Sequence, residues 1–164
     1  QDSKIAGMAH EAGKGSVIAV NKWDAVEKDE HSMTTARRKL EQDFSFMSYA
    51  PIVFISAKTG LRIGSLFEAV NAAAKSNATR ISTGKLNEVL SEATERVQPP
   101  TDKGRRLKIY YMTQVSVRTP TFALFHFSYQ RYLENIIRET FELTGTPVRF
   151  IVRERGERRG EALS

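Results

Sequence analysis

The stretch SVIAVNKWD at residues 16–24, together with PIVFISAKTG at residues 51–60, decides the fold. Each opens on a short apolar run rich in β-branched residues, Ser16–Val20 and Pro51–Ile55, and then turns polar. Such runs are typical of strands that are buried on both faces, so we expect two strands of a parallel sheet. The polar residues that follow each run are expected in loops at the carboxyl ends of the strands.

Amphipathic helices are predicted around these two strands. Residues 2–12 form a candidate helix that Gly13 ends, and further helices are expected between the strands and after the second one. The apolar positions at helical spacing are Met33, Ala36, Leu40 and Phe44, and then Leu66, Phe67, Val70, Ala73 and Ala74. The order helix–strand–helix–strand–helix predicts an α/β unit with right-handed crossovers.

A small, polar stretch at residues 76–84 is where we place a domain boundary, with a first unit at 1–79 and a second at 80–164. Ser82 or Thr83 is suited to cap the next helix. The apolar face of that helix is Leu86, Val89, Leu90, Ala93 and Val97. Alternation begins at Leu107 and breaks at Thr119-Pro120, after which a second extended stretch follows. Tyr132 to Phe141 then mark a helix that ends near Gly145, and residues 148–152 are a last strand. This order predicts an α-β-β-α-β unit with its helices on one face of a three-stranded sheet, and residues 154–164 as a solvated basic tail.

Composition excludes several classes of protein. The 164 residues include no cysteine, so disulfides and cysteine metal sites are excluded. No apolar run approaches the roughly 18–20 residues that cross a bilayer. The histidines His10, His31 and His126 have no ligand spacing, so we predict no metal site. Residues 1–79 carry 10 basic and 9 acidic side chains, whereas residues 80–164 carry 15 and 10. The basic second unit suggests contact with phosphate backbones, although the same excess also suits a merely solvated surface.

Asn21, Lys22 and Asp24 follow the first strand, and Ser56, Ala57 and Lys58 follow the second. In an open parallel sheet, ligands bind beyond the carboxyl ends of the strands, where both groups fall. Guanine presents a ring N–H beside an amino group, and one carboxylate, that of Asp24, can accept from both. Adenine lacks this paired donor edge and would be rejected.

The other residues of the two motifs have expected roles in the same site. The aliphatic stems of Lys22 and Lys58 could cover the faces of the base, and the Ala57 N–H could donate to the guanine carbonyl. Asn21 is expected mainly to tie the two loops together, and Trp23 to pack the loop rather than stack on the base. A polar turn without any ligand remains the alternative for the first motif taken alone.

The chain resembles a known family over nearly its whole length, to about Arg153. The resemblance is carried by VNKWD, SAKTG, GKLNEVL, GRRLKIYYMTQVSVRTPTF and SYQRYLENIIRETFELTGTPVRF. These segments are similar to the bacterial ribosome-biogenesis GTPases called Der or EngA, which have two tandem G domains and a C-terminal KH-like domain. The resemblance implies that residues 1–79 are the nucleotide-base-binding half of a P-loop-type G domain and that residues 80–164 are the KH-like domain.

The resemblance also implies a cofactor, partners and a location. Family members bind GTP and GDP with Mg²⁺, hydrolyse GTP, and act in the cytoplasm on assembly of the large ribosomal subunit, touching ribosomal RNA. The first G domain of the same protein is a further expected partner. The sequence has no G-x-x-x-x-G-K-[ST], since Gly7 and Gly13 are separated by five residues and Gly15 follows Lys14. We therefore expect the chain to be part of a longer protein, to lack catalytic residues and to hydrolyse nothing alone, with Mg²⁺ binding only alongside the phosphate-binding half.

Candidate RNA or ribosome contacts lie in the basic second unit. They are Lys103, Arg105, Arg106, Lys108 and Arg118. The G-x-x-G loop by which KH domains grip a nucleic-acid backbone is absent from the sequence, so charge alone supports this prediction. Relative to the family, the connection near Phe125 and His126 is short, which indicates a deleted or missing loop. Two alternatives remain open: an RNA- or ribosome-binding module without a nucleotide role, and an Era-like GTPase with a KH domain.

Overall fold

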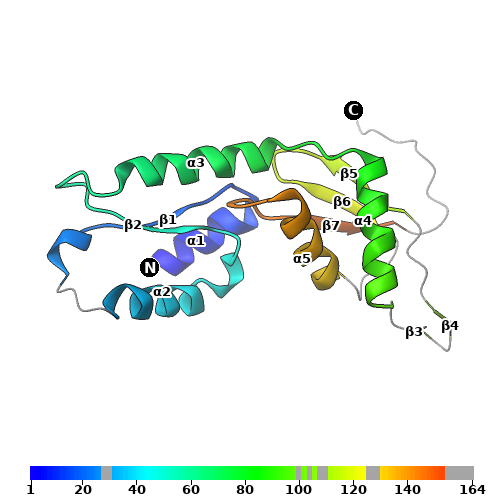
Figure 1. Ribbon diagram of the computed structural model, residues 1–164, viewed down its shortest axis with the longest axis horizontal. Helices are drawn as coiled ribbons and strands as arrows, with labels where there is room; N and C mark the ends of the chain where they lie inside the picture. The colour runs from blue at the N-terminus through cyan, green and yellow to red at the C-terminus, as the bar shows by residue number, and fades with distance from the viewer. Residues whose placement is uncertain (27–30, 99–100, 103–104, 107–110, 125–129, 154–164) are drawn as a thin grey trace.

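The computed structural model describes residues 1–26, 31–98, 101–102, 105–106, 111–124 and 130–153. Two units lie next to each other along the long axis of the molecule, and the helix α3 runs from the first toward the second (Figure 1). The predicted loop at Phe125 and His126 and the predicted tail at 154–164 fall outside the described residues. No helix within the described ranges has the length and apolar character needed to cross a membrane.

The first unit is a two-stranded parallel sheet between helices, in the order that the sequence predicts. Its elements are α1 (Asp2–Glu11), β1 (Ile18–Val20), η1 (Trp23–Ala25), α2 (Ser32–Asp43), η2 (Ser45–Met47), β2 (Ile52–Phe54) and α3 (Ile63–Ala78). Ile18 pairs with Ile52 and Val20 with Phe54. Helix α3 covers one face of this sheet, and α1 and α2 lie on the other (Figure 1). A glycine, Gly13, with a φ of +70° follows α1, as expected for a helix end.

The second unit contains the predicted α-β-β-α-β order. Its elements are α4 (Thr83–Arg96), β3 (Thr101–Asp102), β4 (Arg105–Arg106), β5 (Thr113–Ser116), β6 (Thr121–Leu124), α5 (Gln130–Phe141) and β7 (Arg149–Val152). The central strand β6 is antiparallel to β5 and parallel to β7. The short antiparallel pair β3–β4 is an addition that the sequence pattern did not predict. Ser82 caps α4, because its Oγ accepts from the Lys85 N–H.

The core of the second unit lies between one face of this sheet and the helices α4 and α5. Its buried members are Ile81, Leu86, Leu90, Ala93, Met112, Phe122, Leu124, Leu133, Ile137 and Leu143. The predicted apolar face of α4 is correct for Leu86, Leu90 and Ala93, whereas Val97 is exposed because it lies beyond the last turn of the helix. This unit therefore encloses a continuous apolar core from its own residues.

In β5 the buried face is not the one with the β-branched residues. Met112 and Gln114 point into the core, while Val115 is exposed. Gln114 is tolerated there because its polar atoms are paired: its Oε1 accepts from the Ile81 N–H at 2.7 Å, and its Nε2 donates to the Thr79 carbonyl at 2.9 Å. The side chain thereby fastens the α3–α4 connection to the edge of the sheet.

The two units meet through a loop that follows α5. Gly145 donates its N–H to the Tyr49 carbonyl at 2.8 Å, and its own carbonyl accepts from the Ser16 N–H at 2.7 Å. Asn77 of α3 donates through Nδ2 to Thr146 Oγ1 at 2.9 Å. A Cβ on Gly145, whose φ is +73°, would lie 2.4 Å from that of Ala73. Only glycine fits this close approach, so the loop is a docking element rather than a simple connection.

Candidate functional site

Asn21 joins the two loops at the carboxyl ends of β1 and β2. Its Oδ1 accepts from the Lys22 N–H at 2.8 Å and from the Ala57 N–H at 3.0 Å. Lys22 has a φ of 61°, a left-handed conformation in which the chain turns sharply after the strand. The two predicted motifs, 36 positions apart in the chain, are thus held together by one side-chain oxygen.

Backbone bonds support the same junction beneath Asn21. The Trp23 N–H donates to the Ile55 carbonyl at 3.0 Å, and the Ile55 N–H donates to the Val20 carbonyl at 2.8 Å. The Trp23 ring is buried with its centroid 4.5 Å from that of Phe54. Trp23 therefore packs beneath the loop, as expected from the sequence, and Asp24, next to it in the short helix η1, is exposed.

Ser56 is a buried residue that shapes the second loop. Its Oγ accepts from the Thr59 N–H at 3.2 Å, its carbonyl accepts from the Gly60 N–H at 2.9 Å, and its N–H donates to the Leu61 carbonyl at 3.1 Å. Gly60 has a φ of +77°, which closes the turn. This arrangement leaves Ala57 and Lys58 exposed.

The site therefore presents five exposed residues from two tied loops: Asn21, Lys22, Asp24, Ala57 and Lys58. This set offers one carboxylate, two ammonium groups on long aliphatic stems and one amide. Together these groups suit a planar heterocycle with hydrogen-bond donors on one edge. The Ala57 N–H donates to Asn21 Oδ1, so a guanine carbonyl would have to share this donor or take it from Asn21.

The candidate RNA contacts are only partly described. Lys103 and Lys108 lie outside the described residues, and Arg105 and Arg106 are described as the backbone of β4 only. Arg118 is exposed in the turn between β5 and β6, with a φ of 59°. The structure thus gives a position for one of these five side chains.

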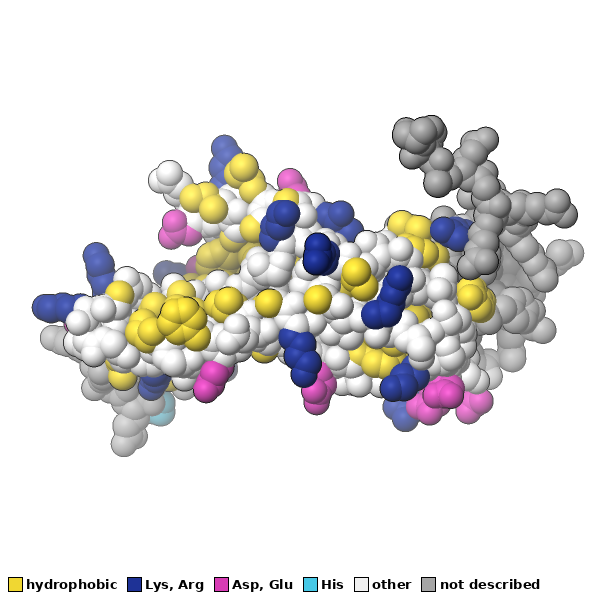
Figure 2. Space-filling model, turned by 90° about the horizontal axis from the view of Figure 1, so that it is seen from above, with side chains coloured by type: hydrophobic (Ala, Val, Ile, Leu, Met, Phe, Trp, Pro, Cys, Tyr) yellow, Lys and Arg dark blue, Asp and Glu magenta, His cyan; other side chains and the backbone are white. Residues whose placement is uncertain are grey.

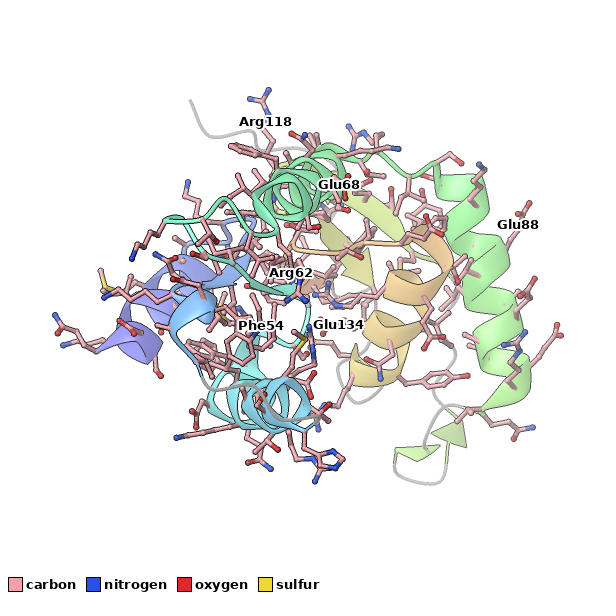
Figure 3. The ribbon with its side chains drawn as sticks, turned by 60° about the vertical axis from the view of Figure 1, so that its left-hand side comes forward. Phe54, Arg62, Glu68, Glu88, Arg118 and Glu134 are labelled. Atoms are coloured by element: carbon pink, nitrogen blue, oxygen red, sulfur yellow. The ribbon has the colours of Figure 1, made fainter. Side chains whose placement is uncertain are left out.

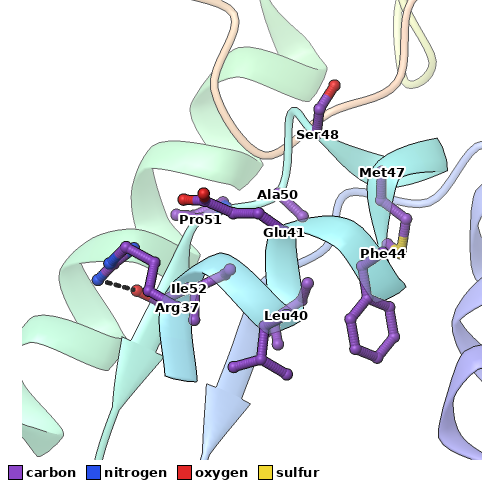
Figure 4. Close-up of a pocket in the computed structure, with 10 residues that line it drawn as sticks. Arg37, Leu40, Glu41, Phe44, Met47, Ser48, Ala50, Pro51 and Ile52 are labelled. Carbon is purple, nitrogen blue, oxygen red and sulfur yellow. Dashed lines mark hydrogen bonds between the residues drawn. The ribbon is translucent and has the colours of Figure 1, made fainter. Parts of the chain in front are cut away.

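A hollow of about 440 Å³ lies between α2 and the start of β2, at the end of the sheet opposite to Asn21 (Figure 4). Apolar side chains of Leu40, Phe44 and Met47 line it. Arg37 spans its wall and donates to the Ile52 carbonyl at 3.3 Å, and its guanidinium lies 5.4 Å from the centre of the Phe54 ring. The cation is thus engaged by the protein itself, so the hollow is a packing feature of the first unit.

Sequence reasoning missed the residues that join the two units. Gly145, Asn77 and Tyr49 carry no motif, and only the G-T-P turn after the α5 pattern gave a local signal, which we interpreted as a helix end. Within the part of the chain that the structure describes, no three His, Asp or Glu side chains are grouped as metal ligands would be.

Comparison with known proteins finds a family match for the second unit and relatives along nearly the whole chain. Residues 80–153 match the family described as the KH-domain-like, C-terminal domain of EngA bacterial GTPase enzymes. The chain is 54% identical to GTPase Der of Caldicellulosiruptor saccharolyticus and 56% identical to GTPase Der of Agathobacter rectalis, over 96% of its residues in both cases. It is 51% identical to GTPase Der of Desulfitobacterium hafniense over 97% of its residues. It spans 38%, 37% and 38% of the lengths of these relatives, respectively.

The fold and these matches define an α/β protein whose second unit is the KH-like domain of a bacterial GTPase class. Over 96% of its residues the chain is similar to proteins named GTPase Der, of whose lengths it spans a little more than a third.

Proposed function

We propose that residues 1–79 are the base-recognising half of a G domain and that residues 80–164 are a KH-like domain of a GTP-binding protein. The observation that carries the proposal is the bond from the Ala57 N–H to Asn21 Oδ1, which unites the two motifs at one edge of the sheet. Asp24 is proposed to accept from the guanine edge, with Lys22 and Lys58 against the base and Ser56 as the support of the second loop. GTP and GDP are the proposed ligands, and Mg²⁺ would bind with phosphate-binding residues that this sequence does not contain.

The free edge of β1 supports the proposal of a partial G domain. Within the described residues, β1 pairs with β2 alone. Ile18 and Val20 direct their backbone groups to β2, so those of Ala19 point the other way. An unpaired edge of this kind invites a further strand.

Apolar hollows flank that edge on both faces of the sheet. Each has a volume of about 270 Å³, and they share Ser16 and Val17 as lining residues. Near them, Ile5 and Met8 of α1 are 60% and 64% exposed, and Phe67 of α3 is 63% exposed. A strand beside β1, with its own covering side chains, would bury these surfaces and extend the parallel sheet.

Hydrogen exchange tests this extension of the sheet. In the 164-residue chain the Ala19 amide should exchange quickly, whereas in the full-length protein it should be protected as strongly as the Ile18 amide. Ile18, which donates to the Pro51 carbonyl, serves as the internal control. Equal, fast exchange of Ala19 in both forms would contradict the partial G domain.

The substitution Asp24→Asn in the full-length protein tests guanine recognition. Charge-assisted hydrogen bonds contribute roughly 1.5–3 kcal/mol each, so GDP affinity should fall by about tenfold or more. Xanthosine diphosphate should bind the variant better than the wild type, because xanthine has a carbonyl where guanine has its amine. Glu68→Gln, which neutralises an exposed carboxylate on α3, is the matched control. An unchanged base preference would favour the alternative interpretation, in which this unit is a scaffold without a nucleotide role.

We further propose a role in assembly of the large ribosomal subunit, in the cytoplasm and in association with the ribosome. The support is the similarity to GTPase Der together with the basic second unit. Ribosomal RNA and the first G domain of the same protein are the proposed partners. Lys103, Arg105, Arg106, Lys108 and Arg118 stay the proposed contacts, tested by salt-dependent RNA binding before and after neutralisation of Arg105 and Arg106.

A further inference from the structure

The turn between β5 and β6 has an unusual backbone. Two successive residues that are not glycine, Arg118 and Thr119, have φ values of 59° and 107°. Asparagine and glycine ordinarily occupy positions with a positive φ. A β-branched residue such as threonine is strongly unfavourable there. A turn of this sequence keeps its shape only where the surroundings hold it, and strain of this kind is concentrated at functional sites.

Contacts with the first unit hold this turn. The Arg118 N–H donates to the Asn77 carbonyl at the end of α3 at 2.7 Å. Thr119 donates through Oγ1 to the Gly13 carbonyl at 2.8 Å. These contacts engage the Arg118 backbone and the Thr119 side chain, while the Arg118 side chain is exposed and points away from the molecule beside α3 (Figure 3).

Two further cations come from the segment that anchors the turn. Lys75 is exposed two residues before Asn77, in the last turn of α3. Arg80 follows α3, and its Nη1 donates to the Gln114 carbonyl at 3.1 Å, which fixes the guanidinium against the edge of β5 that is unpaired within the described residues. The structure thus gathers Lys75, Arg80 and Arg118 around one short connection, although they lie on separate elements.

The segments that carry these cations contain no opposing charge. Residues 71–82 include Lys75 and Arg80 without an acidic residue, and residues 111–124 include Arg118 without one. Seen from the side of α3, several Lys and Arg side chains lie across the middle of the molecule and others at its left end and lower edge, whereas acidic side chains lie mainly along its upper and lower edges (Figure 2). Positive potential therefore accumulates across the junction of the two units.

We propose that Lys75, Arg80 and Arg118 form one phosphate-binding surface, the junction surface, which holds the sugar–phosphate backbone of RNA. The inference rests on the RNA role proposed above and moves part of that contact from the β3–β4 region to the border between the units. The hydrogen bond from the Arg118 N–H to the Asn77 carbonyl holds the β5–β6 turn at the end of α3, so the docked arrangement of the two units is part of the site.

The chemistry of the surface favours a nucleic-acid backbone over an acidic protein. Two of the three cations are arginines, whose planar fork matches phosphate oxygens. The exposed residues close to them in the chain, Ala74, Ala78 and Ser116, are small and allow a backbone to approach closely. Most protein hydrogen bonds to nucleic acids go to phosphates and sugars, which need no base-reading pocket.

Fluorescence anisotropy with a labelled RNA hairpin tests the junction surface in the 164-residue chain and in the full-length protein. Lys75→Gln combined with Arg118→Gln should weaken binding several-fold at low salt. It should also reduce the slope of log affinity against log salt by about 0.7–0.9 for each phosphate that is no longer neutralised. Arg118→Lys should retain most of the slope. The matched control is Arg38→Gln with Lys39→Gln, which removes the same charge from exposed positions on α2, on the opposite side of the sheet from α3.

The outcomes separate this inference from the proposed RNA role. Loss of slope in the Lys75/Arg118 variant, with the α2 control unchanged, supports the junction surface. If the wild type binds but only Arg105→Gln with Arg106→Gln reduces the slope, the junction surface is wrong and the RNA role stands. Binding of the wild type to polyglutamate but not to the hairpin would overturn both. Circular dichroism and thermal unfolding of each variant verify that the fold is retained.

Discussion

The β1–β2 sheet and the β5–β6–β7 sheet differ in how much of their apolar surface the described chain covers. The three-stranded sheet places Phe122 and Leu124 of its central strand against Leu133 and Ile137 of α5, all fully buried. Within the described residues, neither outer edge of the two-stranded sheet is paired, and near the β1 edge Ile5, Met8 and Phe67 remain exposed. A unit that encloses its own core can be tested by itself, whereas exposed apolar surface on both faces of an edge strand indicates a further packing partner.

The largest effect is expected from Phe122→Ala. This substitution removes a fully buried ring at the centre of the second unit and should lower the free energy of unfolding by about 3–5 kcal/mol. Ile5→Ala on α1 should change it by less than about 0.5 kcal/mol in the 164-residue chain, because that side chain is already exposed. Urea titration monitored by circular dichroism measures both. Equal losses in the two variants would remove the contrast between the sheets.

Gly145→Ala tests whether the two units are packed as closely as the contacts indicate. The new Cβ would lie 2.4 Å from that of Ala73, at a φ of +73°, so we expect a loss of about 1–3 kcal/mol. Gly84→Ala in the first turn of α4 is the control, since nothing lies within 4 Å of its added Cβ. That variant should be neutral or more stable by up to about 1 kcal/mol. A neutral Gly145→Ala would mean that the units are not docked in solution.

Gln114→Leu tests how much the buried hydrogen bonds at the edge of the second sheet contribute to stability. The substitution leaves the buried Ile81 N–H without its acceptor and the Thr79 carbonyl without its donor, so a loss of about 1–3 kcal/mol is expected. Val115→Thr, at an exposed position of the same strand, should change stability by about 0.5 kcal/mol at most. Thermal unfolding of the two variants checks this, and a stabilised Gln114→Leu would show that the buried amide is dispensable.

The smallest effect concerns Tyr49, next to the docking loop. Burial raises the pKa of the Tyr49 hydroxyl, and the nearby Arg138 guanidinium partly opposes that rise. A raised folded-state pKa means that the contribution to stability is fully present below pH 10, the ordinary value, and is lost as pH rises through the folded-state pKa. Tyr49→Phe should therefore lose stability less steeply than the wild type above that pH. Parallel slopes would contradict the assignment.

The sequence predicted most elements because their signals are local. The apolar runs that became β1 and β2, the helical spacing of α2 and α5, and the glycine after α1 all act within a few residues. That the loops carrying Asn21 and Ala57 lie together also followed from a rule, since carboxyl ends of parallel strands meet at one edge. The bond from the Ala57 N–H to Asn21 Oδ1 was not predicted, because that donor was assigned to the guanine carbonyl.

Other features depended on contacts between distant parts of the chain. Gln114 is buried in place of Val115 because three backbone groups of the α3–α4 connection and the strand end require its amide, which no alternation pattern reveals. Gly145 is needed because Ala73 lies against it, 72 positions earlier in the sequence. Phe67 was predicted on the apolar face of α3, but its side chain is exposed, because helical spacing does not reveal what packs against that face.

Asn77 is hydrogen-bonded to two segments of the second unit. Its backbone carbonyl accepts from the β5–β6 turn, and its side-chain Nδ2 donates to the loop after α5. A protease that nicks the chain between Ala78 and Ser82 would therefore not release two separate pieces. The nicked halves should co-elute on a sizing column until denaturant is added, because their attachment does not depend on the peptide link between them.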